Sequence, residues 1–579
     1  MKRPKRPPRT VRLANPRRRL HVSLVLICVL LSLLAGRLVQ LQGLDASTYA
    51  VAAGNDRLRT VTIPALRGPI LDRDGEPLAQ SVEAYDLTVD QTLVTNPAAY
   101  ALQLEAVLDA DARTIQRKLT GDKRFAYVVK KVTPETWRAV QDMGLQGMNA
   151  EPASQRAYPA GAVAGNVVGF TGAEGHGMAG LELSMDSTLA GDDGQVTCQK
   201  SAGGQCIPLG NGSSDEAVEG QGLRLTIDRD VQWYAEQALA GAVAKARADG
   251  GVVVVEDVRT GEIVAMATSP VVDPNEPGET DERNRRNLAV EEAYEPGSVF
   301  KPLTMAAVVE EGMAGPATVF SVPDHISRSG ETINDYYDHP QQQMTLAGAM
   351  AKSSNIGTLL AAERIDKGAF HDHLVDFGLG SKPGLGLPGE SAGQLPADWS
   401  DLTRDTIAFG QGVSVSTVQM ASAYATIANG GLRMEPRLIA ATIDADGAET
   451  LATPAAAERV ISEETADAVT LMMEGVMGED GTGRSSGVEG YRVAGKTGTA
   501  QRVDPACGCY RDYNASFMGF APADDPRYVV AVSLLNPQRG NSGGALAGPV
   551  FSEVMAFTLA QLGVAPTGTE PPTVKLYAG

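Results

Sequence analysis

Hydrophobic residues cluster most strongly near the start of the chain. Fifteen residues without a charge run from Val22 to Gly36, between Arg19 and Arg37. A membrane span needs about 20 apolar residues, and the two arginines can lengthen this run because their side chains snorkel towards the interface. The pattern predicts one transmembrane helix over residues 20–41. A cleaved signal peptide is the alternative, but no convincing A-x-A cleavage site follows the run, so we expect an uncleaved anchor.

The rest of the chain mixes short apolar strands with helical segments. Residues 61–217 contain strand-like pieces ("AYDLTVD", "FAYVVKKV"), glycine-rich loops and a turn signal at Asp74-Gly75. From residue 218 a short strand leads into a helix, and residues 250–268 read as two strands joined at a Thr-Gly turn.

Helical segments then fill much of residues 300–475. Strands return late ("RVAGKTGTA", "NASFMGFAP", "RYVVAVSLLN"), before a helix near residues 549–562 and a Pro- and Thr-rich tail. Strands at both ends of the region, with helices between them, predict one α/β domain whose sheet is completed late in the sequence.

Charge is distributed unevenly along the chain. Residues 1–44 contain ten Lys or Arg and no acid, whereas the whole chain has a net charge of −20, so the remaining 535 residues carry −30. A basic arm directly before an apolar run is typical of a cytoplasmic flank under the positive-inside rule. The acidic body would then lie outside the cytoplasm, and its charge disfavours nucleic acid as a partner.

The chain has five cysteines, which is compatible with a location outside the cytoplasm, where disulfides form. Cys28 lies inside the predicted span, while Cys198 and Cys206 flank a short glycine-rich loop and could pair. Cys507 and Cys509 form C-G-C, where an internal disulfide would be tight. The six histidines are scattered, so we expect no metal site.

The stretch "YEPGSVFKPLT" places a serine and a lysine one helical turn apart. Pro296 and Gly297 end the preceding segment, and the apolar run that follows is typical of a helix beginning near Ser298. Lys301 then shares a face with Ser298 and can act as its base if burial lowers the lysine pKa. On this stretch alone, a serine N-cap followed by a solvated lysine is the simpler interpretation.

Two further polar clusters favour a catalytic interpretation. "AKSSNIGT" contains Ser353 and Asn355, and "AGKTGTAQ" contains Lys496 followed by the Thr497–Thr499 segment. On a strand, Thr497 and Thr499 project from one face and can receive a carboxylate together with a lysine. Each cluster alone is a weak signal, but the ordered set S-x-x-K, S-x-N and K-T-G is the one shared by β-lactamases and penicillin-binding proteins.

With these motifs in place, the chain resembles the class B penicillin-binding proteins, and among them the transpeptidases of cell division. "RGPILDRDGEPLA" is similar to the family signature R-G-x-I-x-D-R-x-G-x-x-L-A, and "YEPGSVFK", "SSNIG" and "AFGQGVSVSTVQMASAYATIANGG" follow in family order. The resemblance runs from about residue 20 to about residue 565. It implies an α/β (α+β) transpeptidase domain like that of serine β-lactamases, preceded by an elongated pedestal domain and one transmembrane helix.

This resemblance divides the chain into five predicted parts. They are a basic cytoplasmic arm, a transmembrane anchor, an N-terminal pedestal, a transpeptidase domain and a disordered tail, over residues 1–19, 20–41, 42–217, 218–565 and 566–579 respectively.

The resemblance also implies acyl transfer without a metal or cofactor. Ser298 is the expected nucleophile and Lys301 its base. Ser353 is expected to relay a proton to the leaving amine, held by Lys301 and Lys496, while Asn355 orients Lys301.

The same resemblance assigns substrate binding to the third motif. Lys496, Thr497 and Thr499 are expected to bind the terminal carboxylate of a peptidoglycan stem peptide, and Gly498 allows its backbone to approach closely. Backbone N–H groups of Ser298 and Thr499 are the expected oxyanion hole.

Several functions remain open at this point. A class A β-lactamase shares the three motifs, but the chain has no E-x-x-L-N sequence between Asn355 and Lys496 for activating hydrolytic water. A β-lactam sensor, an inactive division scaffold and an elongation-type transpeptidase are further alternatives. For a division enzyme, the expected partners are stem peptides, β-lactam antibiotics, the membrane, a SEDS-family glycosyltransferase such as FtsW and other division proteins.

Overall fold

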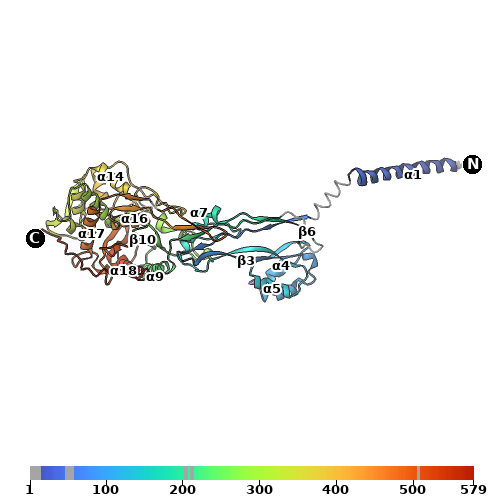
Figure 1. Cartoon of the computed structure of the whole chain (residues 1–579), viewed down its shortest axis with the longest axis horizontal. Helices are drawn as coiled ribbons and strands as arrows, with labels where there is room; N and C mark the ends of the chain where they lie inside the picture. The colour runs from blue at the N-terminus through green and yellow to red at the C-terminus, as the bar shows by residue number, and fades with distance from the viewer. Residues whose placement is uncertain are drawn as a thin grey trace, which may run out of the picture. The chain divides into compact units, whose positions relative to one another are not determined.

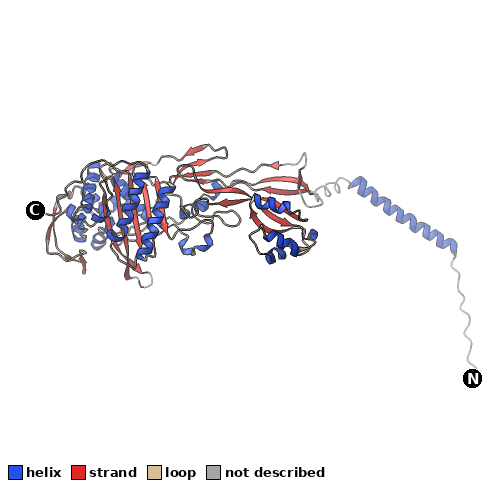
Figure 2. Cartoon of the chain, turned by 90° about the horizontal axis from the view of Figure 1, so that it is seen from below, coloured by secondary structure: helices blue, strands red, loops and turns tan. Residues whose placement is uncertain are grey.

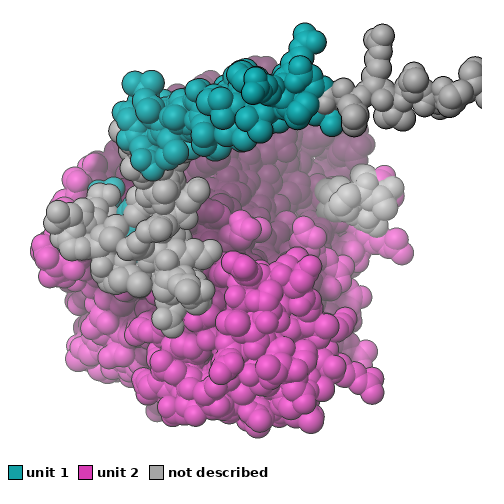
Figure 3. Space-filling view, turned by 90° about the vertical axis from the view of Figure 1, so that its right-hand side faces the viewer, with its two compact units in different colours: residues 1–63, 193–217 teal, residues 64–192, 218–579 magenta. Residues whose placement is uncertain are grey.

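The computed structural model describes residues 15–45, 58–200, 206–208, 214–454, 456–504, 507 and 509–578. The chain separates into two compact units (Figure 3). One comprises residues 1–63 and 193–217, and the other residues 64–192 and 218–579.

The first unit contains the predicted transmembrane segment. Helix α1 (Pro16–Val39) continues as the π-helical turn η1 (Gln40–Leu44), and none of its residues is buried. Together they are long and apolar enough to cross a membrane. The unit also contains a small antiparallel sheet of strands β1 (Leu58–Ile63), β6 (Gly194–Lys200), β7 (Cys206–Pro208) and β8 (Ser214–Asp215).

The second unit contains a seven-stranded mixed sheet in the order β18-β17-β9-β2-β3-β4, with β5 also pairing with β3. Its strands are β2 (Ile70–Leu71), β3 (Pro77–Val89), β4 (Ala126–Val132), β5 (Met148–Ala157), β9 (Gly222–Leu225), β17 (Ile439–Ile443) and β18 (Glu449–Leu451). Gly75 forms the predicted turn between β2 and β3 with φ +89°. Because β9 pairs with both β2 and β17, this sheet crosses the expected boundary between residues 217 and 218.

The same unit contains the late-completed antiparallel sheet that the sequence predicted. Its order is β11-β10-β22-β21-β20, with strands β10 (Gly250–Asp257), β11 (Ile263–Ser269), β20 (Ala494–Asp504), β21 (Cys509–Ala521) and β22 (Tyr528–Leu535). In β22, Val530 and Val532 pack into one hydrophobic core, while Val529 and Ala531 pack into another. Both faces are therefore covered, which explains the unbroken apolar run of this strand.

Helices cover both faces of this sheet (Figures 1 and 2). Helices α9 (Arg229–Ala246) and α18 (Gly543–Gln561) contribute to one core. Helices α11 (Lys301–Glu310), α16 (Thr417–Ala428) and α17 (Glu463–Met477) contribute to the other. Helix α18 is also long and apolar enough to span a membrane, but Val550 and Phe551 pack it into the core beside the sheet.

Shorter elements complete the second unit. They are α3 (Pro97–Glu105), α4 (Ala112–Leu119), α5 (Pro134–Asp142), α6 (Gly165–Val168), α7 (Gly180–Ser184), α8 (Asp186–Leu189), α10 (Leu288–Glu291), α12 (Leu346–Ala351), α13 (Asn355–Ala362), α14 (Lys367–Asp376), α15 (Asp401–Ile407), β12 (Val319–Val322), β13 (His325–Arg328), β14 (Glu331–Asn334), β15 (Gln342–Thr345), β16 (Leu432–Met434) and β19 (Ala457–Arg459).

A disordered tail was expected over residues 566–579, and the structure corrects this expectation at Leu576 and Ala578. The Leu576 carbonyl accepts a hydrogen bond from the backbone N–H of Thr345 (3.0 Å), and the N–H of Ala578 donates to the Gln343 carbonyl (3.0 Å). The end of the chain thus pairs with β15. Backbone pairing of this kind needs no apolar periodicity, which is why the Pro- and Thr-rich composition was misleading.

The described residues answer one of the questions about the cysteines. Cys507 and Cys509 form a disulfide within C-G-C, with their Cα atoms 5.2 Å apart. Cys198 is disulfide-bonded, whereas the side chain of Cys206 lies outside the described residues. Cys28 is a free thiol in α1.

Candidate active site

Ser298 lies at the start of a helix, as its Pro-Gly flank predicted. It belongs to the 3₁₀ turn η5 (Gly297–Phe300), which leads directly into α11. Gly297 has φ +60° and its N–H donates to the Gly410 carbonyl (3.0 Å). A Cβ at Gly297 would lie 2.8 Å from the Cβ of Ala500, so both the backbone angle and the close packing against β20 require glycine.

Lys301 is fully buried, so the interpretation as a solvated lysine is wrong. Its Nζ donates to the Ser353 carbonyl (2.6 Å), to Oδ1 of Asn355 (2.8 Å) and to Oγ of Ser353 (3.3 Å). Burial lowers the pKa of Lys301 to about 7, although Asp335 opposes the change. Among the described residues, its amine makes no hydrogen bond with the Ser298 hydroxyl.

The S-S-N motif forms the turn between α12 and α13. Ser353 adopts φ +57°, an uncommon conformation for a residue with a Cβ. Ser354 is structural, because its Oγ accepts the N–H of Gly357 (2.8 Å) and caps α13. The turn therefore directs Ser353 and Asn355 towards Lys301 and leaves Ser354 beneath them.

The K-T-G-T motif lies on β20, an edge strand of the five-stranded sheet. Nζ of Lys496 donates to Oγ of Ser353 (2.9 Å) and to the Thr497 carbonyl (3.0 Å). Thr497 and Thr499 line the same cavity, as their strand spacing predicted. A Cβ at Gly498 would lie 2.2 Å from Oγ of Ser516, so this position must be glycine for the strand to pack.

The two buried lysines influence each other electrostatically. Burial, and then the positive charge of Lys301, lower the pKa of Lys496 well below its usual value. Two ammonium groups sharing the Ser353 hydroxyl repel each other, so the resting site favours a neutral amine on at least one of them. An anion entering beside Lys496 would favour its charged form.

Five of the predicted site residues line a cavity of about 360 Å³, namely Ser298, Ser353, Asn355, Thr497 and Thr499. Lys301 and Lys496 are buried behind this lining, and Gly498 is not part of it. The described lining contains no Asp or Glu and consists of Gly297, Ser298, Tyr336, Lys352, Ser353, Asn355, Phe409, Gln411, Thr482, Thr497, Thr499, Gln501, Tyr513, Asn541 and Ser542. Motif analysis missed the amide and phenol side chains of this set. Gln501 continues the alternation of Thr497 and Thr499 along β20, and that spacing could have identified it.

A buried carboxylate, that of Asp335, accepts hydrogen bonds from the S-S-N turn and the start of α13. Asp335 follows β14 and accepts hydrogen bonds from Oγ of Ser354 (2.6 Å) and the N–H of Ile356 (3.0 Å). Nε2 of His339 lies 3.1 Å from Asp335 Oδ2. Sequence analysis missed both residues because neither belongs to a motif.

Two family models match this chain. The model for the penicillin binding protein transpeptidase domain matches residues 251–556, and the model for the penicillin-binding protein dimerisation domain matches residues 62–225. The chain belongs to the class B penicillin-binding proteins. The first match contains all three motifs of the cavity, and the second contains β2 to β5 of the seven-stranded sheet.

This penicillin-binding protein has similar relatives along nearly its whole length. It is 37% identical to the penicillin-binding protein PbpB of Mycolicibacterium smegmatis, over 95% of this chain and 91% of the relative. It is 33% identical to the peptidoglycan D,D-transpeptidase FtsI of Escherichia coli, over 93% of this chain and 91% of the relative.

A solved structure is similar as well. The crystal structure of penicillin binding protein 3 from Mycobacterium tuberculosis in complex with aztreonam has a TM-score of 0.71 and 34% identity. The match covers 90% of this penicillin-binding protein and all of that chain.

Proposed function

We propose that this penicillin-binding protein is a membrane-anchored D,D-transpeptidase that cross-links peptidoglycan stem peptides through an acyl-serine intermediate. The observation that carries the proposal is the buried amine of Lys301, whose pKa is lowered to about 7, one helical turn from a serine that faces the cavity. A neutral amine in that position can accept the proton of a serine hydroxyl.

In the first step, Oγ of Ser298 attacks the carbonyl carbon between the last two D-alanines of a stem peptide. Lys301 accepts the hydroxyl proton as the C–O bond forms. Backbone N–H groups of Ser298 and Thr499 stabilise the resulting oxyanion, and the N-terminal end of the helix at Ser298 adds a favourable dipole.

In the second step, the C–N bond breaks and the terminal D-alanine leaves. Its amine takes a proton through the Ser353 hydroxyl, which is 2.9 Å from Lys496 and 3.3 Å from Lys301. The amine of a second stem peptide then attacks the acyl-serine, loses a proton to the same network and releases Ser298. Asn355 keeps Lys301 oriented throughout, through its 2.8 Å hydrogen bond.

The terminal carboxylate of the donor peptide binds along β20. Lys496 supplies the charge, and the hydroxyls of Thr497 and Thr499 supply hydrogen bonds. Gly498 has no such part in the proposal, because its missing side chain would point away from the cavity, towards Ser516 and Val299. β-Lactam antibiotics carry the equivalent carboxylate and would acylate Ser298 at the same place. The described lining residues include no carboxylate that could activate water as in a class A β-lactamase.

We assign this activity to the wall of the dividing septum, with elongation as the alternative. The basic arm (1–19) would lie in the cytoplasm, the anchor (20–41) in the membrane, and the pedestal (42–217) and transpeptidase domain (218–565) outside. A SEDS-family glycosyltransferase such as FtsW and other division proteins are the proposed partners. Imaging a fluorescent fusion distinguishes the two roles, because a division enzyme concentrates at midcell and an elongation enzyme follows the growing side wall.

The enzymatic proposal is tested with the purified full-length protein in detergent. We expect a stem peptide ending in D-alanyl-D-alanine and an amine acceptor to yield a cross-linked peptide and free D-alanine in equal amounts, measured by mass spectrometry. Release of D-alanine with only a hydrolysed peptide would contradict transpeptidation, and no release would favour a sensor or an inactive scaffold.

A further inference from the structure

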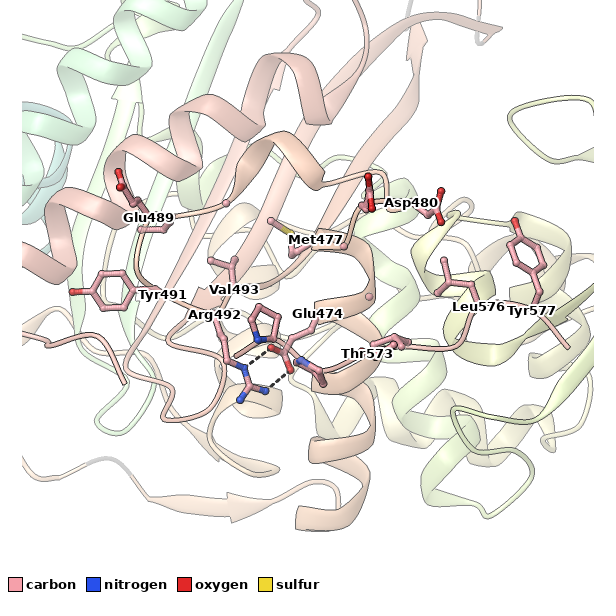
Figure 4. A pocket seen from close by; sticks show the side chains of 18 residues that line it. Glu474, Met477, Asp480, Glu489, Tyr491, Arg492, Val493, Thr573, Leu576 and Tyr577 are labelled. Atoms are coloured by element: carbon pink, nitrogen blue, oxygen red, sulfur yellow. Dashed lines mark hydrogen bonds and ion pairs between the residues drawn. The ribbon is translucent and has the colours of Figure 1, made fainter. Parts of the chain in front are cut away.

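The last described residues of the chain form an extended segment that we term the C-terminal strap, residues 571–578. The strap lines a second cavity, of about 800 Å³, together with Glu474, Asp480 and Arg492 (Figure 4). Dashed lines in Figure 4 join Glu474 to Arg492, whose guanidinium also donates to Thr569 (3.2 Å) just before the strap begins. The strap is thus tethered on one side of the cavity.

Beyond the cavity, the strap is attached to the start of the helix that leads into Ser353. Oγ of Thr345 donates to the Lys575 carbonyl (2.7 Å) and accepts the N–H of Gly348 (2.9 Å), which makes Thr345 the N-cap of α12. The Thr345 hydroxyl therefore donates a hydrogen bond to the strap and accepts one from the helix. Because α12 ends two residues before Ser353, the strap helps to fix that helix from its opposite end.

The contact is too close for a side chain at Gly348. A Cβ at this residue would lie 2.0 Å from the Leu576 carbonyl oxygen and 2.8 Å from Cγ of Met344. The second neighbour is a flexible side chain that can move, whereas the first is strap backbone. Alanine at this position would displace the strap while favouring the helix itself.

A second series of contacts joins the strap to the same turn. Tyr577 lies beside Tyr337, whose pKa is raised to about 12 by burial and then by Tyr577 and Asp335. The Tyr337 ring packs against His339, with centroids 5.1 Å apart. His339 contacts Asp335 (3.1 Å), which accepts the Ser354 hydroxyl (2.6 Å).

We propose that the C-terminal strap is a positioning element for the acylation site, holding the S-S-N turn through Thr345 and α12 on one side and through the Tyr337–Asp335 series on the other. Ser353 and Asn355 carry the hydrogen bonds of Lys301, so displacement of the turn misaligns the amine that accepts the serine proton. This inference rests on the proposed function. It goes further in making the rate of serine acylation depend on residues that do not line the catalytic cavity.

The test compares the full-length protein in detergent with a chain that ends at Thr569. Both are mixed with saturating fluorescent penicillin, and the rate constant and the final extent of labelling are measured separately. A misplacement of about 1 Å can slow chemistry by about 100-fold, so we expect the truncated chain to label at least about tenfold more slowly with an unchanged final extent. Partial unfolding would instead lower the final extent.

Gly348→Ala in the full chain provides a second variant that keeps the strap. We expect it to slow labelling by a similar factor, whereas Gly241→Ala, in open space on α9, should leave the rate unchanged. In the truncated chain, Gly348→Ala should slow labelling by less than about twofold, because the Leu576 carbonyl that the alanine side chain would displace is absent.

Three outcomes would overturn the inference. They are equal labelling rates for the truncated and full-length chains, an unaffected rate for full-length Gly348→Ala, and the same penalty for Gly348→Ala with and without the strap. If the truncated chain does not fold, the full-length variant alone decides. Failure of the proposed function is distinguishable, because the unaltered protein would then form no cross-linked peptide and release no D-alanine from a stem peptide, whatever the labelling rates of the variants.

Discussion

The side-chain amines of Lys301 and Lys496 meet at a single hydroxyl group, that of Ser353. The distances from Nζ to Oγ are 3.3 Å and 2.9 Å, and both lysines are fully buried. Three groups that are far apart in the sequence thus form one path for a proton. The reaction needs a neutral amine to accept a proton and a charged amine to bind a carboxylate. In our proposal Lys301 is the neutral amine and Lys496 is the charged one.

Substitution of Lys301 tests its role as the base. Lys301→Arg keeps a positive charge but cannot supply a neutral amine near pH 7. We expect acylation by a β-lactam to slow by about 10² to 10⁴, the usual contribution of a general base. Stopped-flow labelling measures the rate, and Lys245→Arg, on the exposed end of α9, serves as the matched control. Near-normal acylation by the Lys301 variant would move the base role elsewhere, with Ser353 the next candidate.

The pH dependence of acylation follows from the lowered pKa of Lys301. Only the neutral amine can accept the proton, so the rate constant should rise about tenfold per pH unit below the pKa of about 7 and level off above it. We would measure it with penicillin over about pH 5 to 9, where the drug's own carboxylate stays ionised. A rate that is flat through neutrality, or that falls as the pH rises, would contradict the assignment.

The threonines of β20 should act through the carboxylate of the ligand. Removing a hydrogen bond to a charged group costs about 1.5–3 kcal/mol, which is about one to two decades in rate. Thr497→Val and Thr499→Val should slow acylation by that factor for ligands that carry the carboxylate. A ligand whose carboxylate is blocked should already acylate the unaltered protein slowly, and the valine substitutions should slow its reaction little further. An equal loss for both ligands would instead indicate damaged packing or a damaged oxyanion hole.

Much of this site could be predicted from the sequence because its chemistry depends on short, ordered motifs. Ser298 with Lys301, Ser353 with Asn355, and the Lys496–Thr499 segment are each fixed by helix or strand spacing, and the structure brings all three together. The roles of these residues remain predictions. The late completion of the sheet was visible in the apolar runs of its strands.

The remaining parts of the site depend on long-range contacts that leave no periodic signal. Asp335 supports the turn through one carboxylate, and nothing around it in the sequence distinguishes it from a surface acid. The C-terminal strap binds through backbone atoms of Leu576 and Ala578, so its side-chain composition indicated disorder instead. Both Asp335 and the strap are held by hydrogen bonds to residues that are distant in the sequence.

The orientation in the membrane follows from the charge of the N-terminal arm. Nine of the ten basic residues in 1–44 precede the apolar run, so we expect the N-terminus inside and the body outside. Alkaline phosphatase fused after residue 579 should be active in intact cells, and a cytoplasmic reporter at the same position should not. The reverse pattern would contradict the topology, and a soluble mature protein beginning near Ala35 or Gly36 would show a cleaved signal instead.

The central claim is that Ser298 is the nucleophile, and covalent labelling tests it most directly. The unaltered protein, incubated with fluorescent penicillin and analysed after denaturation, should carry one stable adduct that peptide mass spectrometry assigns to Ser298. Ser298→Ala should fold with an unchanged melting temperature and carry no adduct, because it lacks the attacking oxygen. Equal labelling of the alanine variant, or an adduct on another residue, would contradict the account.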